Sequence, residues 1–82
     1  MQPLEQRILD VIKRHLRSVL PNLDPELISA DASLRDLGCN SIDRADVVTL
    51  TMEELDVTVP VSALAEVRDI RTLVHAIAQQ MR

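Results

Sequence analysis

The stretch that decides the fold runs Leu37-Gly38-Cys39-Asn40-Ser41-Ile42-Asp43-Arg44-Ala45-Asp46-Val47-Val48. A glycine that can close a turn in the left-handed conformation is followed by small or polar residues and then by an apolar-acidic helix. Ser41 stands where the loop becomes the helix, and either Asn40 or Ser41 can cap that helix. The stretch therefore predicts a reachable hydroxyl group at a helix corner.

The helix that begins at this corner is expected to span residues 41–55. At roughly 100° per residue, its positions separate into three groups. The group assigned to the core consists of Val47, Val48, Thr51 and Leu55, and an acidic arc roughly opposite consists of Asp43, Asp46, Glu53 and Glu54. A milder stripe beside the arc consists of Ile42, Ala45, Thr49 and Met52. This stripe is either a surface for a partner or the edge of the core, and the sequence leaves both open.

Further helices are expected on both sides of this one. Apolar residues at the helical period predict a helix over residues 4–19, which Pro21 ends. A short helix over residues 61–66 and a last helix over residues 70–81, capped by Asp69, are expected downstream. The apolar faces of the first and last helices are Leu4, Ile8, Val11, Ile12, Leu16, Val19, Ile70, Leu73, Val74, Ile77 and Met81. The predicted fold is all-α, a small four-helix bundle of three main helices and one short one.

The connection over residues 20–40 is long but carries structural signals. Asp24-Pro25-Glu26 is typical of a cap followed by a helical turn, and Ser33 can cap a second turn that Gly38 closes. The residues expected to fix the loop to the core are Leu23, Leu27 and Ile28. A connection longer than about 15 residues in a compact domain is usually functional.

Composition indicates one small globular domain over residues 1–82. Hydrophobic residues make up 46% of the chain and aromatic residues are absent, so the core must be aliphatic. Cys39 is the only cysteine, which excludes an internal disulfide, and one thiol with two separated histidines does not suggest a metal site. The sequence has neither a bilayer-length apolar run nor a secretory leader pattern. We therefore expect a cytoplasmic monomer that does not enter a membrane.

The net charge of −4 conceals an uneven distribution. Residues 1–20 are net positive, whereas residues 21–70 hold eleven acidic residues against Arg35, Arg44 and Arg68. The acidic middle disfavours nucleic acid, whose phosphates need cations, and favours partners with basic surfaces.

Enzymatic roles find little support in the residue pattern. A serine hydrolase needs a base beside its nucleophile, but His15 and His75 lie in other helical segments. We expect His15 to be solvated, His75 to lie at the surface, and Cys39 to fill a tight turn. From position alone, Ser41 is either an ordinary cap or a modification site, because a helix N-terminus favours an attached phosphodiester.

The chain resembles the acyl carrier proteins over nearly its whole length. That family has a long loop, a hydrophobic-Gly pair, a variable residue, then Asp-Ser-Leu and an acidic helix. The corresponding residues here are Leu37-Gly38-Cys39-Asn40-Ser41-Ile42, and Met52-Glu53-Glu54-Leu55 and Val59-Pro60 agree downstream. The resemblance implies that a phosphopantetheinyl transferase attaches 4′-phosphopantetheine to Ser41. It also implies that the carrier catalyses nothing itself and that biosynthetic enzymes dock only transiently on the second helix.

Two departures from the family pattern narrow the expected partners. Asn40 replaces the usual Asp, and Arg44 adds a cation near the corner. The run Ser41-Ile42-Asp43-Arg44-Ala45 is similar to stand-alone carriers of polyketide β-branching cassettes. Such a carrier receives a malonyl unit from an acyltransferase, a decarboxylating ketosynthase-like enzyme converts it to acetyl, and a hydroxymethylglutaryl (HMG)-synthase-like enzyme takes the acetyl group. The open alternatives are a carrier for another polyketide, lipid or fatty-acid synthase, and an unmodified interaction module.

The resemblance also implies which residues contact these enzymes. The predicted docking residues are Asn40, Ile42, Asp43, Arg44, Ala45, Asp46, Thr49, Met52 and Glu53. A charge reversed at Arg44 would let the synthase distinguish donor from acceptor carriers.

Overall fold

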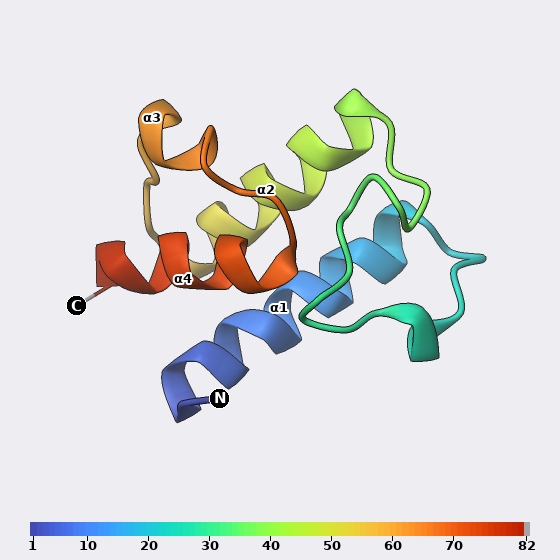
Figure 1. Cartoon of the computed structure of the whole chain (residues 1–82), viewed down its shortest axis with the longest axis horizontal. Coiled ribbons are helices and arrows are strands. Elements are labelled where there is room, and N and C mark those ends of the chain that lie inside the picture. The colour runs from blue at the N-terminus through green and yellow to red at the C-terminus, as the bar shows by residue number, and fades with distance from the viewer. Residues whose placement is uncertain (82) are drawn as a thin grey trace.

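The computed structural model describes residues 1–81, and the elements in this part are all helical (Figure 1). They are α1 (Pro3–Val19), the 3₁₀ turn η1 (Pro25–Leu27), α2 (Ser41–Leu55), α3 (Val61–Leu64) and α4 (Ile70–Met81). The predicted all-α fold is confirmed, and the three long helices begin and end within one residue of the predicted bounds. The short helix ends at Leu64, two residues early, because the chain turns there.

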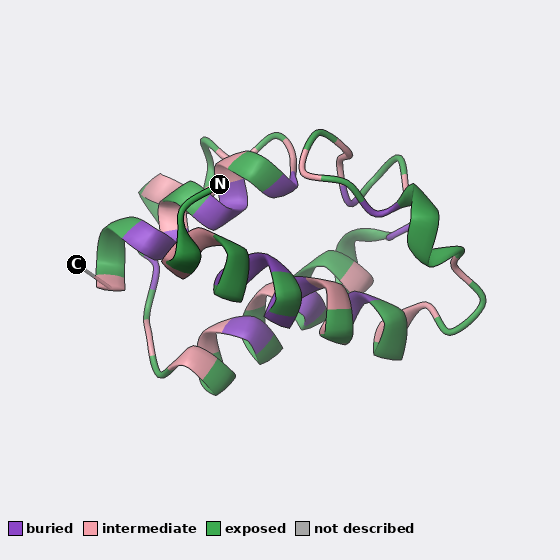
Figure 2. Ribbon diagram, turned by 90° about the horizontal axis from the view of Figure 1, so that it is seen from below, coloured by how far each residue is buried: buried purple, intermediate pink, exposed green. Residues whose placement is uncertain are grey.

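An aliphatic core joins the three long helices. α1 packs against both α2 and α4, and the buried faces of the helices turn inward (Figure 2). The side chains that no solvent reaches are Ile8, Ile12, Leu16, Val47, Thr51, Ile70, Leu73, Val74 and Ile77. Leu9 and Ala78 are also buried, which the sequence did not indicate. Five predicted core positions lie at the margin and are only half-buried: Leu4, Val19, Val48, Leu55 and Met81.

Thr51 is the one buried polar side chain in the described part of the chain. Its hydroxyl donates a hydrogen bond of 2.7 Å to the carbonyl of Val47, one turn earlier in α2. A buried hydroxyl without a partner is destabilising, and this bond within the helix removes that penalty. The prediction that Thr51 belongs to the core is therefore confirmed.

The long loop over residues 20–40 is attached to the bundle. The Asp24 side chain accepts a hydrogen bond from the Glu26 N–H and caps η1, as predicted. The first two amides of α4 donate to the loop, Ile70 to the Ala32 carbonyl at 2.9 Å and Arg71 to the Ala30 carbonyl at 2.8 Å. Amides at a helix start have no partner within their own helix, so the loop supplies the missing acceptors.

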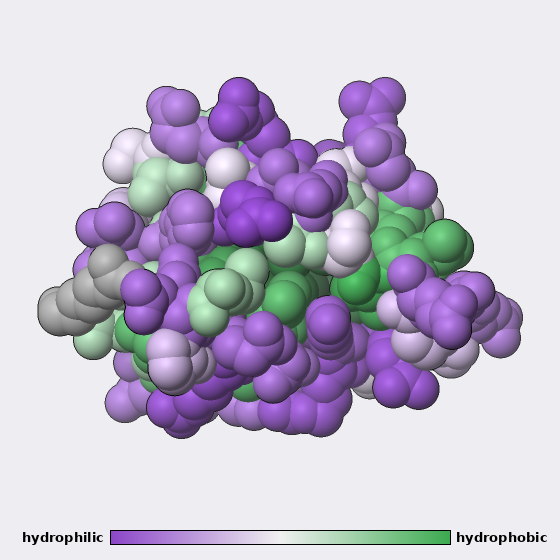
Figure 3. Space-filling view, turned by 60° about the horizontal axis from the view of Figure 1, so that its bottom comes forward, coloured by the Kyte–Doolittle hydropathy of each residue, from purple (hydrophilic) through white to green (hydrophobic). Residues whose placement is uncertain are grey.

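One predicted anchor of this loop is wrong. Ile28 is 5% exposed and Leu23 is half-buried, but Leu27 is 59% exposed. Leu27 ends η1 and lies on its solvent side, whereas its neighbour Ile28 enters the core. In the view of Figure 3, hydrophilic side chains cover most of the surface and apolar ones show through in patches. Within residues 1–81, no helix has both the length and the apolar content to cross a membrane.

Candidate functional site

The corner before α2 is built by backbone and side-chain hydrogen bonds. Ser33 caps a turn by accepting a 3.0 Å bond from the Asp36 N–H, and Gly38 closes it with a φ of 105°. The N–H of Cys39 then donates to the Leu34 carbonyl at 3.0 Å. Cys39 is 5% exposed and burial raises the pKa of its thiol, so it fills the turn rather than reacting.

Asn40, rather than Ser41, caps α2. Its side-chain oxygen accepts from the Asp43 N–H at 2.8 Å, and the Asp43 carboxylate accepts from the Asn40 N–H at 3.2 Å. This reciprocal capping box removes the ambiguity that the sequence left. Ser41 is exposed, and among residues 1–81 its hydroxyl has no hydrogen-bond partner.

The predicted docking residues differ in exposure. Those that are exposed are Asn40, Ile42, Arg44, Ala45, Asp46, Thr49 and Glu53. Ile42 is 70% exposed, which is unusual for a large apolar side chain and leaves it available for contact. Asp43 and Met52 are half-buried; Asp43 is part of the capping box, and the Met52 sulfur accepts from the Val59 N–H at 3.4 Å.

A cleft of about 380 Å³ lies between α2 and α3 and has mostly apolar walls. Its lining residues on α2 are Arg44, Ala45, Val48, Thr49 and Met52. These positions are three, four, seven, eight and eleven residues beyond Ser41. They therefore lie on the same side of α2 as Ser41, further toward the C-terminal end of the helix. Ala45, Thr49 and Met52 of the stripe whose role the sequence left open therefore line a cleft that leads away from Ser41, whereas Ile42 does not line it.

Glu54, predicted as part of the acidic arc, faces α1 instead. Both of its carboxylate oxygens accept from Arg14, at 2.7 and 2.5 Å, and His15 Nε2 lies 2.8 Å away. The guanidinium holds the pKa of Glu54 at about 2, below its ordinary value of 4.5. This also corrects the prediction for His15, whose side chain is 17% exposed rather than solvated.

Neither histidine serves as a base for Ser41. His15 contacts Glu54 at the far end of α2, and His75, which is at the surface as predicted, contacts Glu5 of α1 at 3.1 Å. The described residues also contain no group of three His, Cys, Asp or Glu side chains that could hold a metal ion.

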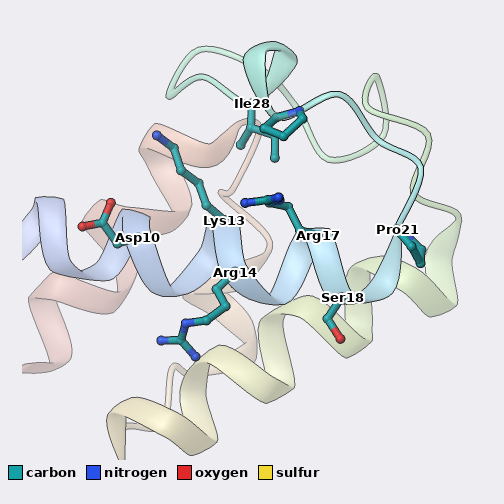
Figure 4. Close-up of a pocket in the computed structure, with 8 residues that line it drawn as sticks. Asp10, Lys13, Arg14, Arg17, Ser18, Pro21 and Ile28 are labelled. Carbon is teal, nitrogen blue, oxygen red and sulfur yellow. The ribbon is translucent and has the colours of Figure 1, made fainter.

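A groove of about 620 Å³ lies between α1 and the long loop rather than at the corner. Lys13 and Arg17 lie on the side of α1 that faces Ile28, whereas Arg14 points toward α2 (Figure 4). The groove is open and carries cations on one wall only. Ser41 does not line it, so this groove is not the predicted site.

A small helical bundle with an exposed hydroxyl at a helix corner suits a protein that presents an attached group. Residues 10–77 match the family model of the phosphopantetheine attachment site. The chain is 31% identical over 78 residues to the polyketide biosynthesis acyl-carrier-protein AcpK of Bacillus subtilis (strain 168), covering 95% of each chain. It is 33% identical over 76 residues to the mitochondrial acyl carrier protein of Saccharomyces cerevisiae, covering 92% of this chain and 60% of the relative. No solved structure matches.

The chain therefore belongs to the acyl carrier protein family. It is a carrier rather than an enzyme, and its cofactor is covalently attached 4′-phosphopantetheine, as the sequence predicted. Its partners are a phosphopantetheinyl transferase and biosynthetic enzymes that it contacts transiently.

Proposed function

We propose that Ser41 is the residue to which the phosphopantetheine arm is attached. Its exposure, its position at the start of α2 and a hydroxyl that the capping box leaves unused support this assignment. The N–H groups of the first turn and the nearby Arg44 favour a phosphodiester at this position. The residues at the corner thus fit the group.

The attached arm supplies a thiol on which an acyl group is carried as a thioester. The chain's own residues keep the arm in place and available. Ser41 anchors it, Asn40 and Asp43 hold the corner, and the rigid bundle lets the tether raise the local concentration of the cargo at each docked enzyme.

Intact-mass measurement tests the attachment. Incubation with coenzyme A and a broad-specificity phosphopantetheinyl transferase is expected to add one phosphopantetheine to the wild-type chain and none to Ser41→Ala. Ser62→Ala, which removes an exposed serine from α3, is the control and should be modified normally. A wild-type chain that gains no mass would instead be an unmodified interaction module.

We propose further that the carrier donates acetyl in polyketide β-branching, to an HMG-synthase-like enzyme. The likeness to a relative named for polyketide biosynthesis supports the pathway, and Asn40 and Arg44 support the donor role. The docking surface would be the exposed residues of α2 around Ile42, including Asp46 and Glu53. Such a surface is small, as a carrier that must leave after each step requires.

Acetyl transfer tests the donor role. The acetyl-loaded chain is offered to a β-branching HMG-synthase-like enzyme together with an acceptor carrier loaded with acetoacetyl. Transfer is expected, and its failure would leave a carrier for another polyketide, lipid or fatty-acid synthase.

Charge reversal at Arg44 tests partner recognition. Arg44→Glu is expected to slow the acetyl transfer by roughly tenfold, since a close charge contact is worth about 1.5 kcal/mol or more in a protein interface. Arg17→Glu makes the same charge change on α1 and should leave the transfer rate unchanged. Equal rates for wild type and Arg44→Glu, with unaltered helical circular dichroism, would exclude Arg44 from the docking surface.

A further inference from the structure

Three arginines from separate parts of the chain converge on one pocket. They are Arg35, Arg44 and Arg68, the only basic residues between positions 21 and 70, where eleven residues are acidic. One follows Ser33 in the loop, one is in α2 and one precedes α4, yet all line a pocket of about 90 Å³. We call these three residues the arginine cluster.

Within residues 1–81, no carboxylate forms an ion pair with the arginine cluster. The arginines that form ion pairs there are Arg14 and Arg71, both outside the cluster. Asp69 also lines the pocket, but its Oδ1 accepts from the N–H and the hydroxyl of Thr72, each at 2.8 Å, and caps α4. Three cations and one carboxylate give the pocket a net positive charge, and a bound anion would reduce it.

The arginine cluster lies beside Ser41. Arg44 is three residues beyond Ser41 on α2, which places their Cβ atoms about 5–6 Å apart. A phosphate ester on the Ser41 hydroxyl would be within reach of the Arg44 guanidinium, whose planar fork matches phosphate oxygens. The pocket, of about 90 Å³, is much smaller than the groove of about 620 Å³ beside α1, which suits an anionic headgroup rather than a peptide.

We propose that the arginine cluster is a phosphate-binding site that holds the phosphodiester of the arm on Ser41. This inference rests on the proposed attachment at Ser41. Arg44, Leu34 and Val67 line both this pocket and the cleft between α2 and α3. Binding the phosphodiester at the cluster therefore starts the arm along that cleft. The arginines act as positioning residues and take no part in acyl transfer.

NMR of the nitrogen-15-labelled chain tests the contact. Conversion of the apo chain to the phosphopantetheinylated chain is expected to shift the Nε–Hε signals of Arg35, Arg44 and Arg68. The signals of Arg7 and Arg17, on the exposed side of α1, should move less. A chain that gains the mass of the arm while the cluster signals stay in place would overturn the arginine site and leave the attachment intact. A chain that gains no mass would overturn both.

Matched triple variants test whether the contact is local. R35Q/R44Q/R68Q should move the phosphorus-31 signal of the arm toward that of free phosphopantetheine. R7Q/K13Q/R17Q removes the same charge from α1 and should not. Equal shifts in both triples would overturn the site, because they would reflect net charge alone. If the cluster triple fails to fold, Arg35→Gln in the exposed loop should give a smaller shift in the same direction, and no shift would count against the proposal.

A third measurement separates the arm from a free anion. The apo chain is titrated with inorganic phosphate while the cluster signals are followed. We expect inorganic phosphate to shift the cluster signals weakly and the attached arm to shift them more. This result supports the proposal, because attachment raises the effective phosphate concentration. Strong shifts with inorganic phosphate and none upon attachment would assign the pocket to a free anion and overturn it.

Discussion

The two sides of α2 are built differently. On the side toward α1, Val47 and Thr51 are fully buried, and the Glu54 carboxylate is hydrogen-bonded to Arg14 and His15. Toward α3, the helix borders a cleft of about 380 Å³, and the residues facing it are exposed or half-buried. One side fixes the helix in the bundle, and the other remains open next to the corner. A carrier needs both properties, because its attachment point must be stationary while its cargo moves.

Truncating one side chain on each side of α2 tests this difference most strongly. Ile12→Ala on α1 removes a side chain that is 0% exposed, and should lower the free energy of unfolding by about 3 kcal/mol. Leu64→Ala on α3 removes one that is half-buried at the cleft, and should cost less than about 1.5 kcal/mol. Urea unfolding followed by far-ultraviolet circular dichroism measures both, since the chain has no tryptophan. Equal losses would mean that the α3 side is packed as tightly as the α1 side.

The cap at the start of α2 should have an intermediate effect. Asn40→Ala leaves the Asp43 N–H without its side-chain acceptor and should reduce the free energy of unfolding by about 1 kcal/mol. Asn40→Asp keeps the acceptor and should be nearly neutral in the same urea experiment. A neutral Asn40→Ala would mean that the corner is held by the loop rather than by the capping box.

The ion pairs between α1 and α2 should have the smallest effect, and it should depend on pH. Because the folded-state pKa of Glu54 is about 2, below its ordinary 4.5, its contribution is present above pH 4.5 and is lost as the pH falls toward 2. Glu54→Gln should therefore be less stable than wild type at pH 7, and the gap should close between pH 4.5 and 2. A gap that is the same at both ends of this range would show that the carboxylate charge does not contribute.

The sequence predicted the backbone well because local signals define it. Apolar spacing located the helices, Asn40 and Asp69 marked where α2 and α4 begin, and Ser33 marked a turn in the loop. Helical periodicity also identified most of the buried face of α1, α2 and α4. Periodicity does not predict which other helix contacts the residues at the edge of a buried face. Glu54 lies at such an edge, and only the position of Arg14 on α1 shows that its side chain faces α1.

The surroundings of the predicted site were harder to foresee. Ser41 could be singled out from its motif, but the choice between Asn40 and Ser41 as the cap depends on hydrogen bonds that sequence leaves open. The convergence of Arg35 and Arg68 on Arg44 was missed, because it depends on how the loop and the turn before α4 pack beside α2. The available signal was that these are the only cations of an acidic segment.

The bonds between the long loop and α4 determine when the loop becomes ordered. Ala30 and Ala32 accept from the first two amides of α4, so the segment leading to the corner is fixed when the bundle forms. Ordering a backbone costs roughly 1–2 kcal/mol per residue at 25 °C. Here the free-energy cost of ordering the loop is part of folding and not part of binding an enzyme. The same preorganised corner can thus meet successive partners, and the lifetime of each encounter depends on the surfaces that touch rather than on ordering of the loop.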